Sequence, residues 1–536
     1  MDQPAARRAL RTKGAAAAAL LALALSALSA CSGFEDPAAP SADGDGKKGG
    51  GGTFSIAVGI DPDTLDPAGQ TTTTVQNMVD YVVQTLLRVD DEGEVVPQLA
   101  TSVETSEDGL TVDIELKKDV VFHDGKPFDA EAVVFNLKRI IDPQLTVPLG
   151  SPFEVMKDIT AVDEDTVQVT LSQPSPGFRS ALSVTTAAMI SPASVNAEGN
   201  TNADYQNPVG TGPYEFEGYT AGESVTLTKF ADYWGEKPHY DKVVFRIVPE
   251  AATRESLLLA GQVNMIILPP VSDLKTLQTN DDVKVLVAPS DRTIFIALDT
   301  NDERLRDPRV RQALNYAVDK RAIIDNVLFG AAEPLDAPMA PSLFGYCKTG
   351  SYDYDTGRAT QLLQEAGATG ISLDLLTPSG RYVQDQQAAE AVVGFLREVG
   401  LKVNVTTSDF PSFLARVNAP PSANTVDMHL LGWAPPYLDA EFAVQMFRKK
   451  THPPKGLATS FYTDPKVEEL LAQADTETDA DAREQAYCDA SKIIWEGAPW
   501  IFLWTQSFPI VHSADVTGIG FTPTEKFSAI YARPRS

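Results

Sequence analysis

The sequence predicts an α/β protein that follows a short N-terminal leader. Strand-like segments such as Ser372–Leu376 and Lys402–Thr407 flank a helical pattern at Gln384–Val399, and this alternation is typical of βαβ units. The composition, 43% hydrophobic and 22% charged, is that of a globular protein. The 536 residues leave room for roughly three units of ~150 residues or for two large lobes.

The first 30 residues have the features of a lipoprotein signal peptide. Basic residues precede an apolar run, Ala15–Leu28, that is too short to span a bilayer with ease. Leu28-Ser29-Ala30-Cys31 resembles a bacterial lipobox, which implies cleavage before Cys31 and a diacylglycerol thioether on its sulfur. The alternative is an ordinary signal peptide with a chance cysteine. Residues 31–52, rich in Gly, Ser, Ala and Asp, are expected to form a flexible linker.

The chain up to residue 250 is expected to contain alternating strands, two helices and punctuating turns. Asp124-Gly125 marks a hairpin-like turn, and the glycines of the loop Pro208–Tyr214 are expected to supply positive φ and close packing. The strands are expected at Thr53–Gly59, Leu110–Leu116, Thr166–Leu171, Ser224–Lys229 and Lys242–Ile247, and the helices at Val75–Leu87 and from an Asp129 cap to Ile140.

Beyond residue 250 the α/β alternation becomes more regular. Gly367 and Gly400 follow two helical segments at the position where glycine commonly ends a helix. The helices are expected at Thr253–Ala260, Arg309–Leu328, Thr356–Ala366 and Gln384–Val399, and the strands at Val263–Leu268, Thr293–Leu298, Ser372–Leu376 and Lys402–Thr407.

Charge and residue spacing exclude several functions. The net charge of −29 disfavours binding to nucleic acid or anionic lipid. The five histidines are scattered, so no metal site or metal cofactor is expected, and no G-x-S-x-G motif or other catalytic set supports an enzyme. Cys347 and Cys488 form an even pair that favours a disulfide in an oxidising compartment, and two free thiols are the alternative.

Ordered motifs along the chain resemble the family 5 extracellular solute-binding proteins of ABC importers. These proteins handle peptides, glutathione and nickel, and the resemblance extends from Thr53 to Pro534. The motifs are Asp63-Thr64-Leu65-Asp66-Pro67, Val121-Phe122-His123-Asp124-Gly125, Gly210-Thr211-Gly212-Pro213-Tyr214, Asp307-Pro308-Arg309-Val310-Arg311 and Leu362-Leu363-Gln364-Glu365-Ala366-Gly367.

The resemblance implies a bilobal fold like that of periplasmic binding proteins (type II, cluster C-like), with two lobes that close about a hinge. Lobe I is expected to combine 53–295 with 505–536, with a subdomain inserted at 85–204, and lobe II to span 296–504. It also implies a monomer without a cofactor, held by its lipid at the extracellular face of the cytoplasmic membrane or in the periplasmic space. Its partners would be a peptide-like ligand and the permease and ATPase of an ABC importer.

Family positions also indicate ligand-binding candidates. Arg381 matches an arginine that dipeptide binders use for the peptide carboxylate, a task that suits the planar guanidinium. Trp433 and Trp504 are either cleft or core tryptophans. The remaining candidates are Tyr437, in the loop after Trp433, and Thr72 and Thr73, after the first strand.

One position departs from the peptide-binding pattern. Peptide binders of the family place an aspartate three residues after the Gly-Trp tryptophan, where this chain has Pro436. Asp439 or Glu441 is a possible substitute, and a glutathione-like or modified peptide is another solution. The alternatives to peptide capture are a nickel chelate or other non-peptide solute, signalling without transport, and a cell-surface hydrolase.

Overall fold

One large mixed sheet organises the protein. The computed structural model describes residues 51–90, 93–145, 147–198 and 205–535, so the predicted signal peptide, Cys31 and nearly all of the linker lie outside the described residues. The sheet has the order β15-β14-β16-β12-β17-β11-β1-β10-β9-β8, with β13 paired to β17. Its strands are β1 (Thr53–Val58), β8 (Tyr214–Thr220), β9 (Ser224–Lys229), β10 (Lys242–Ile247), β11 (Met265–Ile267), β12 (Val283–Leu298), β13 (Ala332–Pro334), β14 (Ser372–Pro378), β15 (Lys402–Ser408), β16 (Met428–Trp433) and β17 (Trp500–Ser513).

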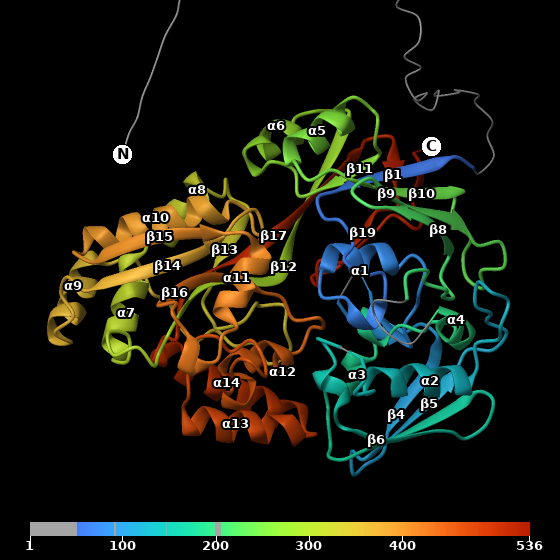
Figure 1. Cartoon of the computed structure of the whole chain (residues 1–536), viewed down its shortest axis with the longest axis horizontal. Helices are drawn as coiled ribbons and strands as arrows, with labels where there is room; N and C mark the ends of the chain where they lie inside the picture. The colour runs from blue at the N-terminus through green and yellow to red at the C-terminus, as the bar shows by residue number, and fades with distance from the viewer. Residues whose placement is uncertain (1–50, 91–92, 146, 199–204, 536) are drawn as a thin grey trace, which may run out of the picture. The chain divides into compact units, whose positions relative to one another are not determined.

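Two long antiparallel strands, β12 and β17, join the two halves of this sheet (Figure 1). Val283–Pro289 pairs with one end of β17, and Thr293–Ala297 pairs with the other. The ladder is interrupted at residues 290–292, where the register shifts. We call the side with β1 and β8–β11 lobe I and the side with β13–β16 lobe II; the irregular segment lies where the strands pass between them.

A second, four-stranded sheet belongs to lobe I. Its order is β4-β5-β7-β6, and α2 packs against β6 and β7. Asp129 caps α2 by accepting a hydrogen bond from the Ala132 N–H, as the sequence predicts. The elements of this region are α1 (Thr73–Val79), β2 (Leu87–Val89), β3 (Val95–Pro97), β4 (Ala100–Thr105), β5 (Thr111–Leu116), α2 (Ala130–Ile140), β6 (Met156–Ala161), β7 (Thr166–Leu171), α3 (Phe178–Ala181) and α4 (Pro192–Glu198). We call the four-stranded sheet, with the elements from β2 to α3 that pack around it, the small-sheet subdomain; α1 packs in the cluster that contains β1 and β10.

Helices cover the lobe II part of the main sheet, and further short elements complete lobe I. No helix in the described part of the chain is both long enough and apolar enough to cross a membrane. The helices are α5 (Ala251–Leu259), α6 (Leu274–Gln278), α7 (Pro308–Ala317), α8 (Lys320–Asn326), α9 (Thr356–Glu365), α10 (Asp385–Glu398), α11 (Phe410–Val417), α12 (Ala440–Ala443), α13 (Pro465–Thr476) and α14 (Ala480–Gly497); the strands are β18 (Val516–Thr517), β19 (Gly520–Phe521), β20 (Phe527–Ser528) and β21 (Arg533–Pro534).

Two helix predictions are wrong in length. The helix expected over Arg309–Leu328 is two helices, because Val318 takes an extended conformation and Asp319 then caps α8 through the Ala322 N–H. The helix expected over Val75–Leu87 ends at Val79. Beyond it, backbone carbonyls of residues 81 and 82 accept hydrogen bonds from the loop at 210–214 rather than from a continuing helix.

That loop explains two of the sequence motifs together. A side chain on Gly210 or Gly212 would collide with the backbone of residues 81–83, so close packing requires both glycines; neither has positive φ, contrary to that part of the prediction. His123 donates from Nε2 to the Gly212 carbonyl at 3.0 Å and accepts from the Gly210 N–H at Nδ1. Burial lowers the pKa of His123 to about 4, so this histidine is a neutral structural residue.

Candidate functional site

A cavity of about 490 Å³ lies at the irregular segment of the two long strands. Lobe I contributes the start of α1 and residues near α5, and lobe II contributes the loop between β14 and α10. The strands themselves contribute Arg292 from β12 and Gln506 from β17. We call this space the hinge cavity; its size and its mixture of apolar walls with a few polar groups suit a small-molecule site.

Arg381 is the charged group of the hinge cavity without a committed partner. Its guanidinium lies 5.2 Å from the Tyr382 ring centroid and 5.1 Å from that of Phe410. Burial, with a contribution from Arg292, lowers its pKa. Among the described residues its guanidinium donates no hydrogen bond, which leaves the planar fork available to an anionic ligand group.

The loop that carries Arg381 is held by a single carboxylate. Asp385, in the first turn of α10, accepts hydrogen bonds from the backbone N–H groups of Gly380 (3.2 Å), Arg381 (2.7 Å) and Tyr382 (3.1 Å). Asp385 is buried, so these bonds are shielded from water. The position of Arg381 is therefore set by the start of the helix that follows it.

A second arginine in the cavity wall is already paired. Arg292 donates to both carboxylate oxygens of Glu525, at 2.9 and 2.6 Å, and both residues are buried. Burial opposes the charge on Arg292, but Glu525 outweighs it and raises the pKa of Arg292. Gln506 accepts from the Val383 N–H at 3.2 Å and so links β17 to the Arg381 loop. These hydrogen-bonded residues line the same cavity as Arg381.

The sequence-predicted site residues fall into three places. Thr72, Thr73 and Arg381 line the hinge cavity together. Trp433 is the last residue of β16 and Tyr437 lies in the segment that follows; Trp433 stacks on Phe442 with 5.4 Å between ring centroids. Trp504 is 2% exposed inside the hydrophobic cluster of lobe II and does not line the cavity.

Sequence reasoning missed Arg292, Glu525 and Gln506. Their contacts join residues up to 233 positions apart, which no local pattern reveals. One signal was present: Ser290-Asp291-Arg292 places three polar residues in the middle of an otherwise strand-like segment. Asp439, considered above as a substitute for the missing aspartate, is engaged by Arg483 through two bonds of 2.8 Å.

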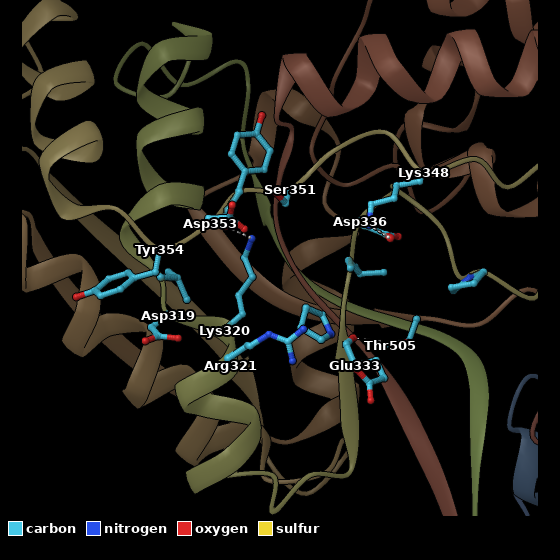
Figure 2. A pocket seen from close by; sticks show the side chains of 15 residues that line it. Asp319, Lys320, Arg321, Glu333, Asp336, Lys348, Ser351, Asp353, Tyr354 and Thr505 are labelled. Atoms are coloured by element: carbon cyan, nitrogen blue, oxygen red, sulfur yellow. Dashed lines mark hydrogen bonds and ion pairs between the residues drawn. The ribbon is translucent and has the colours of Figure 1, made fainter.

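A second cavity, of about 660 Å³, lies within lobe II between α8, the segment around β13 and residues 348–354 (Figure 2). Lys320 is 6% exposed; its Nζ donates to the Tyr352 carbonyl at 3.3 Å. Burial lowers the pKa of Lys320 to about 7, against a smaller opposing effect of Asp353. Lys348 pairs with Asp336 at 3.4 Å on the rim. We call this space the lobe II cavity.

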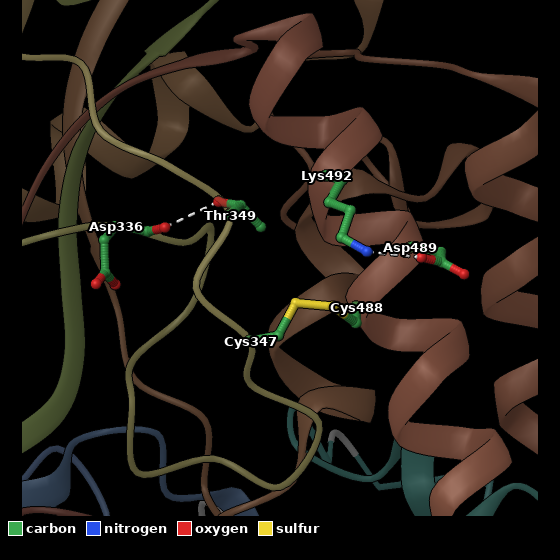
Figure 3. The surroundings of a disulfide bond; sticks show 6 residues. All are labelled: Asp336, Cys347, Thr349, Cys488, Asp489 and Lys492. Atoms are coloured by element: carbon green, nitrogen blue, oxygen red, sulfur yellow. Dashed lines mark hydrogen bonds and ion pairs between the residues drawn. A yellow bond between two sulfur atoms is a disulfide. The ribbon is translucent and has the colours of Figure 1, made fainter.

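A disulfide joins Cys347, next to this rim, to Cys488 on α14, with 5.4 Å between their Cα atoms (Figure 3). Thr349 donates to the Asp336 carbonyl at 2.8 Å, so the chain is fixed on both sides of Lys348. No group of three or more potential metal ligands occurs among residues 51–90, 93–145, 147–198 and 205–535.

Two lobes joined by paired strands, with a ligand-sized cavity at the crossing, define a bilobal binding protein of the periplasmic type. Residues 94–455 match the family described as "Bacterial extracellular solute-binding proteins, family 5 Middle". The chain therefore belongs to this family, whose members are transport proteins that deliver solutes to ABC importers and are not enzymes.

Sequence relatives include glutathione-binding proteins. The GsiB protein of Pectobacterium atrosepticum is 33% identical over 476 residues, which cover 88% of this chain and 92% of the relative. GsiB of Escherichia coli K12 is 31% identical, with coverages of 88% and 93%.

Solved structures with the same fold bind different ligands. DppA of Helicobacter pylori, in complex with the peptide STSA, is 26% identical with a TM-score of 0.79, and the match covers 89% of this chain and 98% of that one. NikZ of Campylobacter jejuni, in complex with Ni(L-His), is 26% identical with a TM-score of 0.78 and coverages of 89% and 99%.

Proposed function

We propose that this solute-binding protein captures a peptide-like ligand with a free carboxylate in the hinge cavity and hands it to its ABC permease. The observation that carries the proposal is Arg381, a half-buried guanidinium in the cavity wall that donates no hydrogen bond among the described residues. A carboxylate would receive two parallel charge-assisted bonds there. Glutathione and the peptide STSA, the ligands of two of the related proteins, carry such groups.

Closure of the lobes accompanies capture in this proposal. Ligand contacts that exist only when both lobes meet favour the closed state by their differential affinity. Thr72 and Thr73 approach from lobe I and Arg381 from lobe II, so a ligand held by all three bridges the lobes. The proposed limits of the lobes are 53–295 with 505–536 for lobe I, including an insert at 85–204, and 296–504 for lobe II.

The proposal also places the protein as a monomer outside the cytoplasmic membrane, anchored by lipid on Cys31. Two acyl chains of a diacylglycerol suffice for stable anchoring. Globomycin treatment of the host, followed by mass determination of the precursor, tests the anchor: accumulation of uncleaved chain supports it. Release of an unmodified mature protein into the medium contradicts it.

The ligand is identified from protein purified from its own host. Small molecules released on denaturation are analysed by mass spectrometry, with metal analysis of the same sample. Short peptides or glutathione-like compounds support the proposal. Stoichiometric nickel with a small chelator points to the alternative cargo, and the absence of stabilisation by any peptide in a thermal-shift library contradicts peptide capture.

A further inference from the structure

The loop Trp433–Phe442 lies beside the hinge cavity and is anchored firmly in lobe II; we call it the plug loop. Asp439 receives two bonds from Arg483 on α14, and the backbone of Phe344 bonds to Leu438 and Ala440 on either side of it. Arg483 and Asp439 are both buried. The base of the loop is therefore a fixed part of lobe II.

The aromatic side chains of the plug loop belong to the core of the other lobe. Tyr437 is fully buried and Phe442 is 5% exposed, and both are members of the hydrophobic cluster built by the small-sheet subdomain. Gly93 lies against the Leu438 side chain, and a Cβ on Gly177 would collide with the Glu441 carboxylate. The loop thus crosses from lobe II into lobe I.

The plug loop also continues the wall of the hinge cavity. Tyr382, which lines the cavity, donates from its hydroxyl to the Gly432 carbonyl at 3.3 Å, and its ring packs against Gly432. Trp433 follows directly and pairs with Thr293, the neighbour of the cavity residue Arg292. Trp433 then stacks on Phe442, which contacts Tyr437 in turn. A row of contacting rings therefore runs from the strand beside this wall into the hydrophobic cluster of lobe I.

We propose that the plug loop limits ligand length: Tyr437 and Phe442 close the cleft beyond Arg381 and restrict the cargo to a short chain of about two or three residues. The hinge cavity, at about 490 Å³, lies in the lower half of the ~300–1,000 Å³ range of small-molecule sites. A five-residue extended chain spans ~17 Å and would have to displace the aromatic row. The inference rests on the proposed capture of a peptide-like ligand.

Two polar atoms of the plug loop show that packing, and not side-chain hydrogen bonding, holds its rings in place. The Tyr437 hydroxyl and the Trp433 Nε1–H are buried and have no hydrogen-bonding partner among the described residues. Buried donors without acceptors destabilise the state that contains them by about 1–3 kcal/mol each. Tyr437 and Phe442 therefore keep their places because their rings fill the cleft. Shortening one of these side chains should open the cleft.

The test uses the full mature protein, freed of ligand by unfolding and refolding, and measures thermal stabilisation by peptides of two to six residues with the same C-terminal residue. We expect the wild type to respond to two- and three-residue peptides and at least tenfold more weakly to five- and six-residue ones. Tyr437→Ala should reduce this discrimination to threefold or less. Phe442→Leu, a milder change, serves the same purpose if Tyr437→Ala does not fold.

Tyr437→Phe is the matched control, because it keeps the ring and removes only the unpaired hydroxyl. It should retain the length limit and fold at least as stably as the wild type. Equal response of the wild type to short and long peptides, or an unchanged limit in both shortened variants, overturns the inference and leaves peptide capture standing. Failure of every peptide to stabilise the wild type overturns the proposed function itself.

Discussion

The hinge cavity and the lobe II cavity differ in whether their buried or half-buried basic side chains already have hydrogen-bonding partners. The lobe II cavity is larger, but Lys348 is paired with Asp336, Lys320 is bonded to a backbone carbonyl within its own lobe, and the third basic residue, Arg321, is exposed to solvent. The hinge cavity is smaller, draws residues from both lobes and contains a half-buried guanidinium, that of Arg381, which donates no hydrogen bond among the described residues. Volume favours the lobe II cavity, whereas the unpaired guanidinium and the contributions from both lobes are the reasons for proposing the hinge cavity as the ligand site.

The largest expected effect is a loss of ligand affinity, and it tests directly which of the two cavities binds the ligand. Arg381→Ala should weaken binding of the ligand recovered from the host-purified protein by at least ~100-fold. Truncating one partner of a buried charge pair costs about 2–5 kcal/mol. Lys320→Met should leave affinity unchanged. Isothermal titration calorimetry of both variants measures the affinities. Equal losses of affinity in the two variants would contradict the assignment of the ligand to the hinge cavity.

Lys320 in the lobe II cavity should make the folding stability of the protein depend on pH. With its pKa lowered from 10.5 to about 7 in the folded protein, Lys320 takes up a proton at a higher pH in the unfolded chain than in the folded one. Folding stability therefore falls as pH decreases from ~10.5 to ~7 and loses nothing more from this group below that window.

Lys320→Met removes this dependence. Its stability relative to the wild type should rise by up to ~1.4 kcal/mol per pH unit as pH is lowered from 10 to 7, reaching a few kcal/mol. Urea unfolding at four pH values measures the slope. A difference that does not change with pH would show that Lys320 is solvated in the folded protein.

A smaller effect is expected from the residue that positions Arg381. Asp385→Asn replaces a carboxylate that accepts hydrogen bonds from four backbone N–H groups by an amide with a single oxygen, so the loop loosens. Affinity should fall about tenfold, or ~1.4 kcal/mol. Asp355→Asn, at the exposed cap of α9, is the matched control: it should cost some stability but no affinity. Equal affinities for both variants would refute the positioning role.

The smallest effect belongs to the rim of the lobe II cavity. Lys348 is 72% exposed on its side chain, and its ion pair with Asp336 is solvated. Exposed pairs of this kind contribute little to stability. Lys348→Ala should change neither the melting temperature nor ligand affinity by a measurable amount, and a clear loss of affinity would give the lobe II cavity a role in binding.

Local patterns predicted the fold well and the site only in part. The cap at Asp129 and the strand Thr166–Leu171 follow from residues that are neighbours in sequence, and the structure confirms both. The break at Val318 was missed because the apolar pattern continues through it; the interruption is visible only in the backbone and in the new cap at Asp319.

The site depends on contacts that are distant in sequence. Arg381 was identified through a family resemblance. The pairing of Arg292 with Glu525 joins β12 to the segment between β19 and β20, and no sequence pattern near either residue predicts it. The role of the plug loop was equally hidden. Tyr437 follows two prolines in a segment that resembles an exposed turn, yet it is fully buried, because the small-sheet subdomain covers it.

The disulfide has a consequence for the timing of activity. Cys347 lies three residues after Phe344, and Cys488 lies five residues after Arg483, the two residues that hold the base of the plug loop. Thiols stay reduced in the cytoplasm and oxidise outside it. Before the disulfide forms, non-covalent contacts alone hold the base of the loop; once it has formed, a covalent ring encloses that base. Oxidation of this cysteine pair therefore adds a covalent constraint to the part of lobe II that carries the proposed length limit.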